Sequence, residues 1–292
     1  MFLRRLVPAT LATLLLLGAS AQAAQAAPVG SAEFSAEQQS AALAFWTPQR
    51  LASATGADTG AAIAATSPQR WTGGGLISST AGKVFFHNPK TNGTYACSGD
   101  AVNSGNRSIV ATAGHCVVDT DGTAYDNWVF IPGYDHGNRP HGTFAATSLH
   151  WESQRIGDSD AAWDAAFATV GTVNGRKLVD TVGGQGIGFD QAPGQQVYSF
   201  GYGGSDAEGR GEQLNWCTGT EFNPGGHAGG GVWGIPCVQT GGSSGGPFLQ
   251  NFDPATGVGT QIGNISISAG DSEYHPYYGW EAHAAYDAAD RG

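Results

Sequence analysis

Basic residues are scarce in this sequence, and long apolar runs are missing beyond its N-terminus. The 292 residues include 13 Lys and Arg against 24 Asp and Glu, which gives a formal net charge of −11 at pH 7. Proteins that bind nucleic acids carry basic patches, so this charge balance argues against a nucleic-acid partner. Because no later run is apolar enough to span a bilayer, we also expect no membrane partner.

The one long apolar run lies near the start and is too short to cross a bilayer. It covers residues 6–17, follows two arginines, and precedes the small residues of positions 21–28. A basic start, a short apolar middle and an A-x-A site are typical of a secretory signal peptide. We therefore predict a signal peptide over residues 1–27, cleaved near Ala27 or, alternatively, Ala23, and a secreted, extracellular product.

Cysteine is rare as well: the four are Cys97, Cys116, Cys217 and Cys237. An even number in an exported chain indicates disulfides, and four cysteines allow three pairings. Sequence proximity favours Cys97–Cys116 and Cys217–Cys237, each stabilising the fold by about 3 kcal/mol. A zinc site around His115 and Cys116 is the alternative, but no Cys-x-x-Cys pair exists. We expect no metal and no cofactor.

Glycine, by contrast, is abundant, and it separates short β-rich segments. There are 46 glycines, and from Trp71 onward runs such as KVFF (83–86) and SIVATA (108–113) alternate with turn residues. This pattern predicts an all-β sandwich or barrel, with one late helix over residues 280–290. Residues 28–70 are rich in Ala, Ser and Thr, with one denser patch, ALAFWTPQRLASA (42–54). They indicate a short helical prosegment followed by a linker, or a disordered tail, in either case outside the core.

Two adjacent serines, Ser243 and Ser244, lie in the glycine-rich stretch QTGGSSGGPFL of residues 239–249. Such stretches are usually turns or linkers. A serine becomes a nucleophile only beside a base, usually histidine, that a third group orients. It also needs backbone amides aimed at the developing oxyanion, and a glycine-rich turn can present them. The stretch fits this chemistry without establishing it alone.

Candidate partners for a reactive serine lie in two other segments. His115 follows a β-rich run in ATAGHCVV, beside a disulfide candidate. Asp164 comes directly before the apolar run of DAAWDAAFATV, where a buried carboxylate requires hydrogen-bond donors such as His115. We expect the nearby Asp158 and Asp160 to be solvated residues at a strand end.

The motifs TAGHC, D-x-A-F and GGSSGGP, in this order, resemble those of the chymotrypsin-like serine peptidases. CSGDAV, FIPGYDHG and YSFGYG extend the resemblance from about Lys83 onward, toward secreted bacterial members related to the glutamyl endopeptidases. The resemblance implies a serine endopeptidase that acts on proteins or peptides through an acyl-enzyme, without a cofactor and as a monomer. It also implies two antiparallel β-barrels, over residues 71–172 and 173–292, with a short C-terminal helix.

Matched residue by residue, the resemblance assigns the chemistry to three side chains. His115 corresponds to the general base, Asp164 to the acid that orients it, and Ser244 to the nucleophile, because Gly-Gly-Pro follows it. The amides of Gly242 and Ser244 correspond to the oxyanion hole. Ser243 departs from the pattern, because many members carry Asp there to pair with a newly cut N-terminus. Activation must therefore work by another route.

Substrate preference is open at the sequence level. The resemblance places the pocket near Val238, Ile265, Ser266 and Ser268. Val238 stands where trypsins carry Asp, so a preference for Lys or Arg is not expected. Ile265 stands where glutamyl-specific members carry His.

Two rival functions remain. GGSSGG also satisfies the G-x-S-x-G pattern of α/β-hydrolase esterases, and His275 and His283 follow it. Those enzymes place the serine before a long helix, which Pro247 disfavours, and the chain lacks alternating β–α units. The second rival is a non-catalytic binding module on a peptidase scaffold, against which the intact trio argues.

Overall fold

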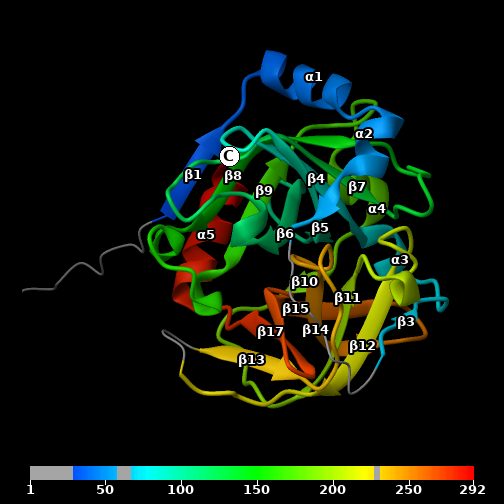
Figure 1. Cartoon of the computed structure of the whole chain (residues 1–292), viewed down its shortest axis with the longest axis vertical. Coiled ribbons are helices and arrows are strands. Elements are labelled where there is room, and N and C mark those ends of the chain that lie inside the picture. Colours follow the sequence, from blue (N-terminus) through cyan, green and yellow to red (C-terminus); the bar gives the residue numbers. More distant parts are fainter. Residues whose placement is uncertain (1–28, 58–66, 227–230) are drawn as a thin grey trace, which may run out of the picture.

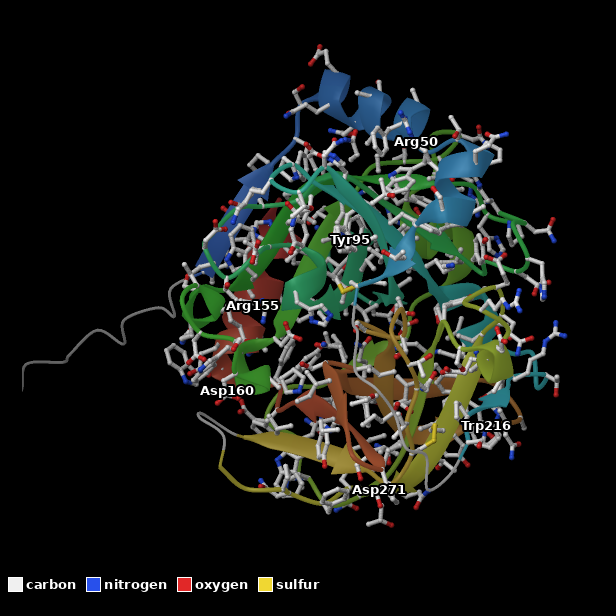
Figure 2. All side chains as sticks on the ribbon, in the orientation of Figure 1. Arg50, Tyr95, Arg155, Asp160, Trp216 and Asp271 are labelled. Atoms are coloured by element: carbon white, nitrogen blue, oxygen red, sulfur yellow. A yellow bond between two sulfur atoms is a disulfide. The ribbon has the colours of Figure 1, made fainter. Side chains whose placement is uncertain are left out.

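The computed structural model describes residues 29–57, 67–226 and 231–292, so the predicted signal peptide lies outside the described residues. The chain forms two β-rich halves, one above the other in Figure 1. Figure 2 shows side chains filling both, with Tyr95 in the first half and Trp216 in the second. No helix in the described part of the chain is long and apolar enough to cross a bilayer.

The first half is a closed barrel of six antiparallel strands. Its ring order is β4–β5–β6–β9–β8–β7, and β7 pairs with β4 to close it. The strands are β4 (Ala81–Asn88), β5 (Gly93–Val102), β6 (Ile109–Ala113), β7 (Asp126–Pro132), β8 (Phe144–Glu152) and β9 (Ala165–Val170). A further strand, β1 (Val29–Glu33), pairs with β8 from outside the ring.

Both faces of strand β4 are buried, which explains why its consecutive residues Val84, Phe85 and Phe86 are all apolar. Successive side chains of a strand point to opposite faces. In β4, Val84 and Phe86 point into the barrel core, while Phe85 points outward and is covered by the N-terminal segment. In β9, Phe167 points outward toward the C-terminal helix.

The second half consists of two sheets around a smaller core. The core combines the disulfide Cys217–Cys237 with Val197, Ile235, Phe248, Ile262 and Ile265. The six-stranded sheet contains β10 (Gly186–Ile187), β15 (Val258–Asn264), β14 (Pro247–Asp253), β11 (Gln196–Gly201), β12 (Asn215–Thr220) and β3 (Gln69–Arg70). The three-stranded sheet contains β13 (Val232–Ile235), β17 (Ser272–Pro276) and β16 (Ile267–Ala269). The predicted all-β fold with two barrels is confirmed, with the second barrel divided between two sheets.

The C-terminal helix α5 (Trp280–Arg291) is also confirmed, and it lies against the first barrel (Figure 1). Ala282, Ala285 and Ala289 bury one face of it. The shorter helices are α3 (Ile77–Thr80) and α4 (Leu178–Val182), with 3₁₀ turns η1 (Gly114–Cys116), η2 (Ser153–Arg155), η3 (Ala161–Trp163) and η4 (Asp206–Glu208).

The expectation that residues 28–70 lie outside the core is wrong for residues 29–57. This segment forms β1, then α1 (Ala36–Phe45) and α2 (Pro48–Ser53), and ends in β2 (Thr55–Gly56), which pairs in parallel with β5. Between the helices, Trp46 is only 2% exposed and its Nε1 donates to the Asn127 carbonyl at 2.6 Å. Burying a Trp side chain contributes several kcal/mol, which holds the segment on the barrel.

Both predicted disulfides are present: Cys97–Cys116 and Cys217–Cys237, with Cα–Cα distances of 6.3 and 6.2 Å. The zinc alternative is excluded at Cys116, because its sulfur and that of Cys97 are bonded to each other and are not thiolates.

Candidate active site

His115 lies where β6 ends and the chain makes a single 3₁₀ turn. That turn, η1, also carries Cys116, whose disulfide ties it to β5. The amide of Gly114 donates to the Asp164 carbonyl at 2.9 Å, and the amide of His115 donates to Asp164 Oδ1 at 2.8 Å. The backbone around the imidazole is therefore fixed on both sides.

Asp164 lies between η3 and β9 and is 1% exposed. Its Oδ2 accepts from His115 Nδ1 at 2.7 Å and from Ser266 Oγ at 2.6 Å. On the other side, Arg155 Nη1 lies 3.0 Å from Oδ1. Burial alone would raise the pKa of this carboxyl, but the charges of His115 and Arg155 and these hydrogen bonds hold it well below its usual range.

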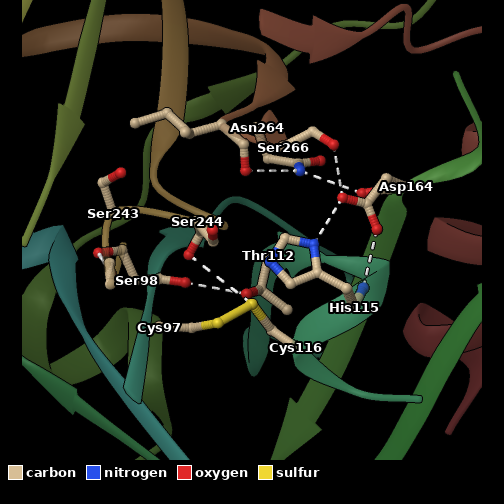
Figure 3. The surroundings of a disulfide bond; sticks show 12 residues. Cys97, Ser98, Thr112, His115, Cys116, Asp164, Ser243, Ser244, Asn264 and Ser266 are labelled. Carbon is tan, nitrogen blue, oxygen red and sulfur yellow. Dashed lines mark hydrogen bonds and ion pairs between the residues drawn. A yellow bond between two sulfur atoms is a disulfide. The ribbon is translucent and has the colours of Figure 1, made fainter. Parts of the chain in front are cut away.

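The contact with Asp164 selects one form of the His115 ring. A carboxylate accepts only, so neutral His115 carries its proton on Nδ1 and leaves Nε2 as an acceptor. In Figure 3 the imidazole stands between Asp164 and Ser244, with its second nitrogen on the serine side. Both His115 Nε2 and Ser244 Oγ are buried, and neither hydrogen-bonds within the part of the chain that the structure describes.

Ser244 lies in a turn that both halves of the molecule hold. Its carbonyl accepts from the Ser98 amide at 2.7 Å, and the next amide, of Gly245, donates to the Ile265 carbonyl at 2.7 Å. Glycine is required on both sides of the serines. Gly242 and Gly245 have φ of +104° and +85°, which other residues rarely adopt.

Ser243, unlike Ser244, has a hydrogen-bond partner for its hydroxyl among the described residues. Ser243 Oγ donates to the Thr240 carbonyl at 2.8 Å, within its own turn. No hydrogen bond from the amides of Gly242 and Ser244 reaches an acceptor among residues 29–57, 67–226 and 231–292. These two amides are therefore the candidate oxyanion donors.

Four residues were expected to line a substrate pocket, and one of them, Ser266, contacts Asp164 instead. Val238 and Ile265 are buried, and Ser268 Oγ donates to the Gln239 carbonyl at 2.9 Å. Ser266 donates its hydroxyl to the Asp164 carboxylate and is therefore part of the hydrogen-bond network around Asp164, not of the pocket lining. Asp158 is exposed, as expected, whereas Asp160 is half-buried and accepts from the Ala162 amide at the start of η3.

Sequence reasoning missed Arg155, because a single arginine before a Gly-Asp turn carries no periodic signal. It also missed Glu208, which contacts the serine loop from 32 residues away. The esterase alternative does not fit this arrangement, since a strand, β14, follows Ser244. His275 is buried against Glu221, with 2.8 Å between His275 Nε2 and Glu221 Oε1.

Neither protein-family models nor curated proteins gave a match to this chain. Among solved structures, the protease Anisep from Arthrobacter nicotinovorans is similar, with a TM-score of 0.69 and 34% sequence identity over 77% of this chain and 100% of that one. The thermostable serine protease AL20 from an extremophilic microorganism gives 0.67 and 35% over 74% of this chain and 99% of that one. A Glu endopeptidase gives 0.62 at 15% identity over 79% of this chain and 100% of that one, which supports the fold alone. The chain therefore belongs to the chymotrypsin-like serine proteases, enzymes that hydrolyse peptide bonds.

Proposed function

We propose that this protein is a secreted serine endopeptidase in which Ser244 is the nucleophile, His115 the general base and Asp164 the orienting acid. The observation that carries the proposal is the hydrogen bond that the Asp164 carboxylate accepts from His115 Nδ1 at 2.7 Å, because it leaves Nε2 free to take a proton. The predicted signal peptide and two disulfides support export to an oxidising compartment.

The reaction proceeds through an acyl-enzyme. Ser244 Oγ attacks the scissile carbonyl carbon while its proton moves to His115 Nε2, and Asp164 stabilises the resulting imidazolium. The amides of Gly242 and Ser244 donate to the oxyanion. When the C–N bond breaks, the leaving amine takes the proton from His115. A water molecule then repeats the sequence on the ester and restores Ser244.

We also propose that residues 28–70 are a prosegment and that its described part hinders access to the site. Gly56 lies so close to the peptide that joins Gly241 and Gly242 that a Cβ on it would be 2.5 Å from the Gly241 oxygen. Beyond it, the Ala57 amide donates to the Ala96 carbonyl at 3.0 Å. Removal of the segment would uncover the approach to the Gly242 amide. The barrels at residues 71–172 and 173–292 would then form the mature, monomeric enzyme.

The test compares the two adjacent serines. In mature enzyme, Ser244→Ala should abolish capture by a fluorophosphonate and lower kcat on a peptide by roughly 10⁶-fold. Ser243→Ala is the matched control and should keep labelling, because its hydroxyl bonds within its own turn. A label mapped to Ser243 contradicts the assignment. A binding module would not label, and an esterase would label but fail to cut protein.

A further inference from the structure

The oxyanion donor Gly242 shares a peptide group with the carbonyl of Gly241. In a trans peptide the C=O and N–H point in opposite directions, so whatever fixes one fixes the other. The Gly204 amide donates to the Gly241 oxygen at 2.9 Å. This contact holds the Gly242 N–H toward the opposite side, where it is free to donate to an oxyanion.

The residue before this peptide, Thr240, is held by a buried carboxylate. Glu208 ends η4 and is 1% exposed. Its Oε1 and Oε2 lie 3.1 and 3.3 Å from the Thr240 amide, and Oε2 also accepts from Thr240 Oγ1. Hydrogen bonds to a carboxylate are about twice as strong as those between neutral groups, so this is a strong attachment of the loop.

The rest of the turn is arranged around that carboxylate. Ser205 Oγ donates to Glu208 Oε2 at 2.6 Å, and the Ser205 amide donates to Thr240 Oγ1 at 2.9 Å. A Cβ on Gly203 would lie 2.7 Å from Glu208 Oε2, so only glycine at position 203 leaves room for the Glu208 carboxylate. Asn215 Nδ2 donates to the Glu208 carbonyl at 2.8 Å and ties the turn to β12.

Ser243, directly before Ser244, carries no charge and cannot anchor the loop through an ion pair. The Ser243 hydroxyl donates a hydrogen bond to the Thr240 carbonyl at 2.8 Å. The amide, hydroxyl and carbonyl of Thr240 are thus all engaged, two of them by Glu208.

From these contacts we propose that Glu208 is a positioning residue for the hydrolysis proposed above. It anchors Thr240 and thereby keeps the Gly241–Gly242 peptide in the orientation that serves the oxyanion. Glu208 thus holds the loop from a neighbouring turn through a carboxylate, whereas Ser243 contributes one hydrogen bond from a neutral hydroxyl.

The experiment measures kcat and KM separately for the full chain carrying Glu208→Ala, Glu208→Gln or Thr240→Val. A trace of tagged wild-type enzyme completes maturation of each variant and is then removed. Loss of an oxyanion donor costs about 10²–10³-fold in kcat. We expect Glu208→Ala to lose ~10²-fold in kcat with little change in KM, and Glu208→Gln to restore part of the loss because it keeps one acceptor oxygen. Thr240→Val, which keeps the side-chain shape, should lose ~10-fold.

A second readout separates positioning from general stability. A peptide aldehyde forms a tetrahedral adduct that needs the oxyanion donors, so its Ki should rise in parallel with the loss of kcat. Glu221→Gln is the control, because Glu221 is another buried glutamate of the same half, paired with His275 away from the loop. It should lower Tm and leave kcat and the aldehyde Ki unchanged.

The outcomes are distinguishable. If wild-type enzyme hydrolyses peptides and Glu208→Ala or Thr240→Val matches its kcat, the anchor is refuted while the protease function stands. If Glu208→Ala does not fold, Thr240→Val decides alone. If wild-type enzyme does not hydrolyse peptides at all, the proposed function fails first.

Discussion

At the scale of the residue, buried carboxylates in this protein have opposite properties. Asp164, Asp100 and Glu273 are each no more than 1% exposed. Donors and cations surround Asp164 and hold its pKa low, despite its burial. Burial raises the pKa of Asp100 to about 8 and that of Glu273 to about 7. The carboxylate of the candidate site is therefore held charged, as the proposed stabilisation of an imidazolium requires, whereas burial favours the protonated form of the other two.

The raised pKa of Asp100 gives a stability prediction. Below about pH 3.9 both folded and unfolded chains carry this proton. As the pH rises toward 8 the unfolded chain releases it and the folded chain does not, so unfolding is favoured by up to about 1.4 kcal/mol per pH unit. Asp100→Asn removes this pH-dependent loss of stability. The difference between the unfolding free energies of Asp100→Asn and of wild type should therefore grow in favour of the variant from pH 5 to pH 7.

Denaturant titrations at pH 5, 6 and 7 measure the effect. Asp158→Asn is the control, because Asp158 is exposed and its replacement should give a curve parallel to wild type. A parallel curve for Asp100→Asn would show that Asp100 ionises inside the fold and would contradict the prediction.

At the scale of the element, the N-terminal segment of residues 29–57 covers one face of the barrel. A capping box of Ser35 and Gln38 precedes helix α1, and α2 has Thr47 as its N-cap and Pro48 at its first position. Such starts stabilise short helices locally. Trp46, between them, supplies the burial, and β2 carries the chain to the proposed oxyanion peptide.

This arrangement predicts that the separated segment inhibits the mature enzyme. A peptide of residues 29–57 should bind in trans and lower the rate of peptide hydrolysis. Trp46→Ala in the peptide should raise Ki by ~10²–10³-fold, because truncating a buried Trp costs about 3–5 kcal/mol. Leu43→Ala should leave Ki unchanged, since Leu43 is 46% exposed. An enzyme that binds the peptide by calorimetry yet keeps full activity would show that the segment does not reach the site.

The sequence predicts much of the fold and of the candidate site, but only for residues whose constraints are local in the chain. Ser244 and its neighbours carry local constraints, such as the glycines with positive φ, that leave a pattern along the chain. The strands and α5 likewise follow from local periodicity. Arg155, Ser266 and Glu208 could not be assigned their contacts, because each depends on a partner brought close only by the folded barrels. Trp46 was missed because the fit of its ring depends on a barrel surface formed by residues much later in the chain.

At the scale of the whole molecule, the candidate site is built from both halves. Asp164 of the first half accepts from Ser266 of the second, and Asn264 Nδ2 donates to the Asp164 carbonyl at 3.1 Å. In return, the Ser98 amide of the first half donates to the Ser244 carbonyl. Neither half alone holds the three side chains in place, so activity requires that the halves are joined.

The N-terminus of the mature enzyme, by contrast, should not contribute to activity. Ser243 cannot form an ion pair with a new α-amino group, and breaking such a buried pair would cost about 3–5 kcal/mol where it exists. We expect mature forms that begin at three different residues between Trp71 and Leu76, each free or acetylated, to hydrolyse a peptide at comparable rates. If only one free N-terminus gave activity, and acetylating it abolished that activity, a carboxylate elsewhere in the protein would have to pair with the new α-amino group. That result would contradict the prediction.

Helix α5 comes last in the chain, yet it completes the first barrel. Its alanines cover Ile109 and Phe167, and the Asp290 carboxylate accepts from the Gly105 and Asn106 amides. A ribosome releases the strands of that barrel long before it makes α5, and until then the outward-facing apolar side chains of β6 and β9 lack their cover. Domains made in sequence usually fold one after another as they emerge. Here the first barrel is completed only after the whole second half has been made, which couples the folding of the first half to the synthesis of the second.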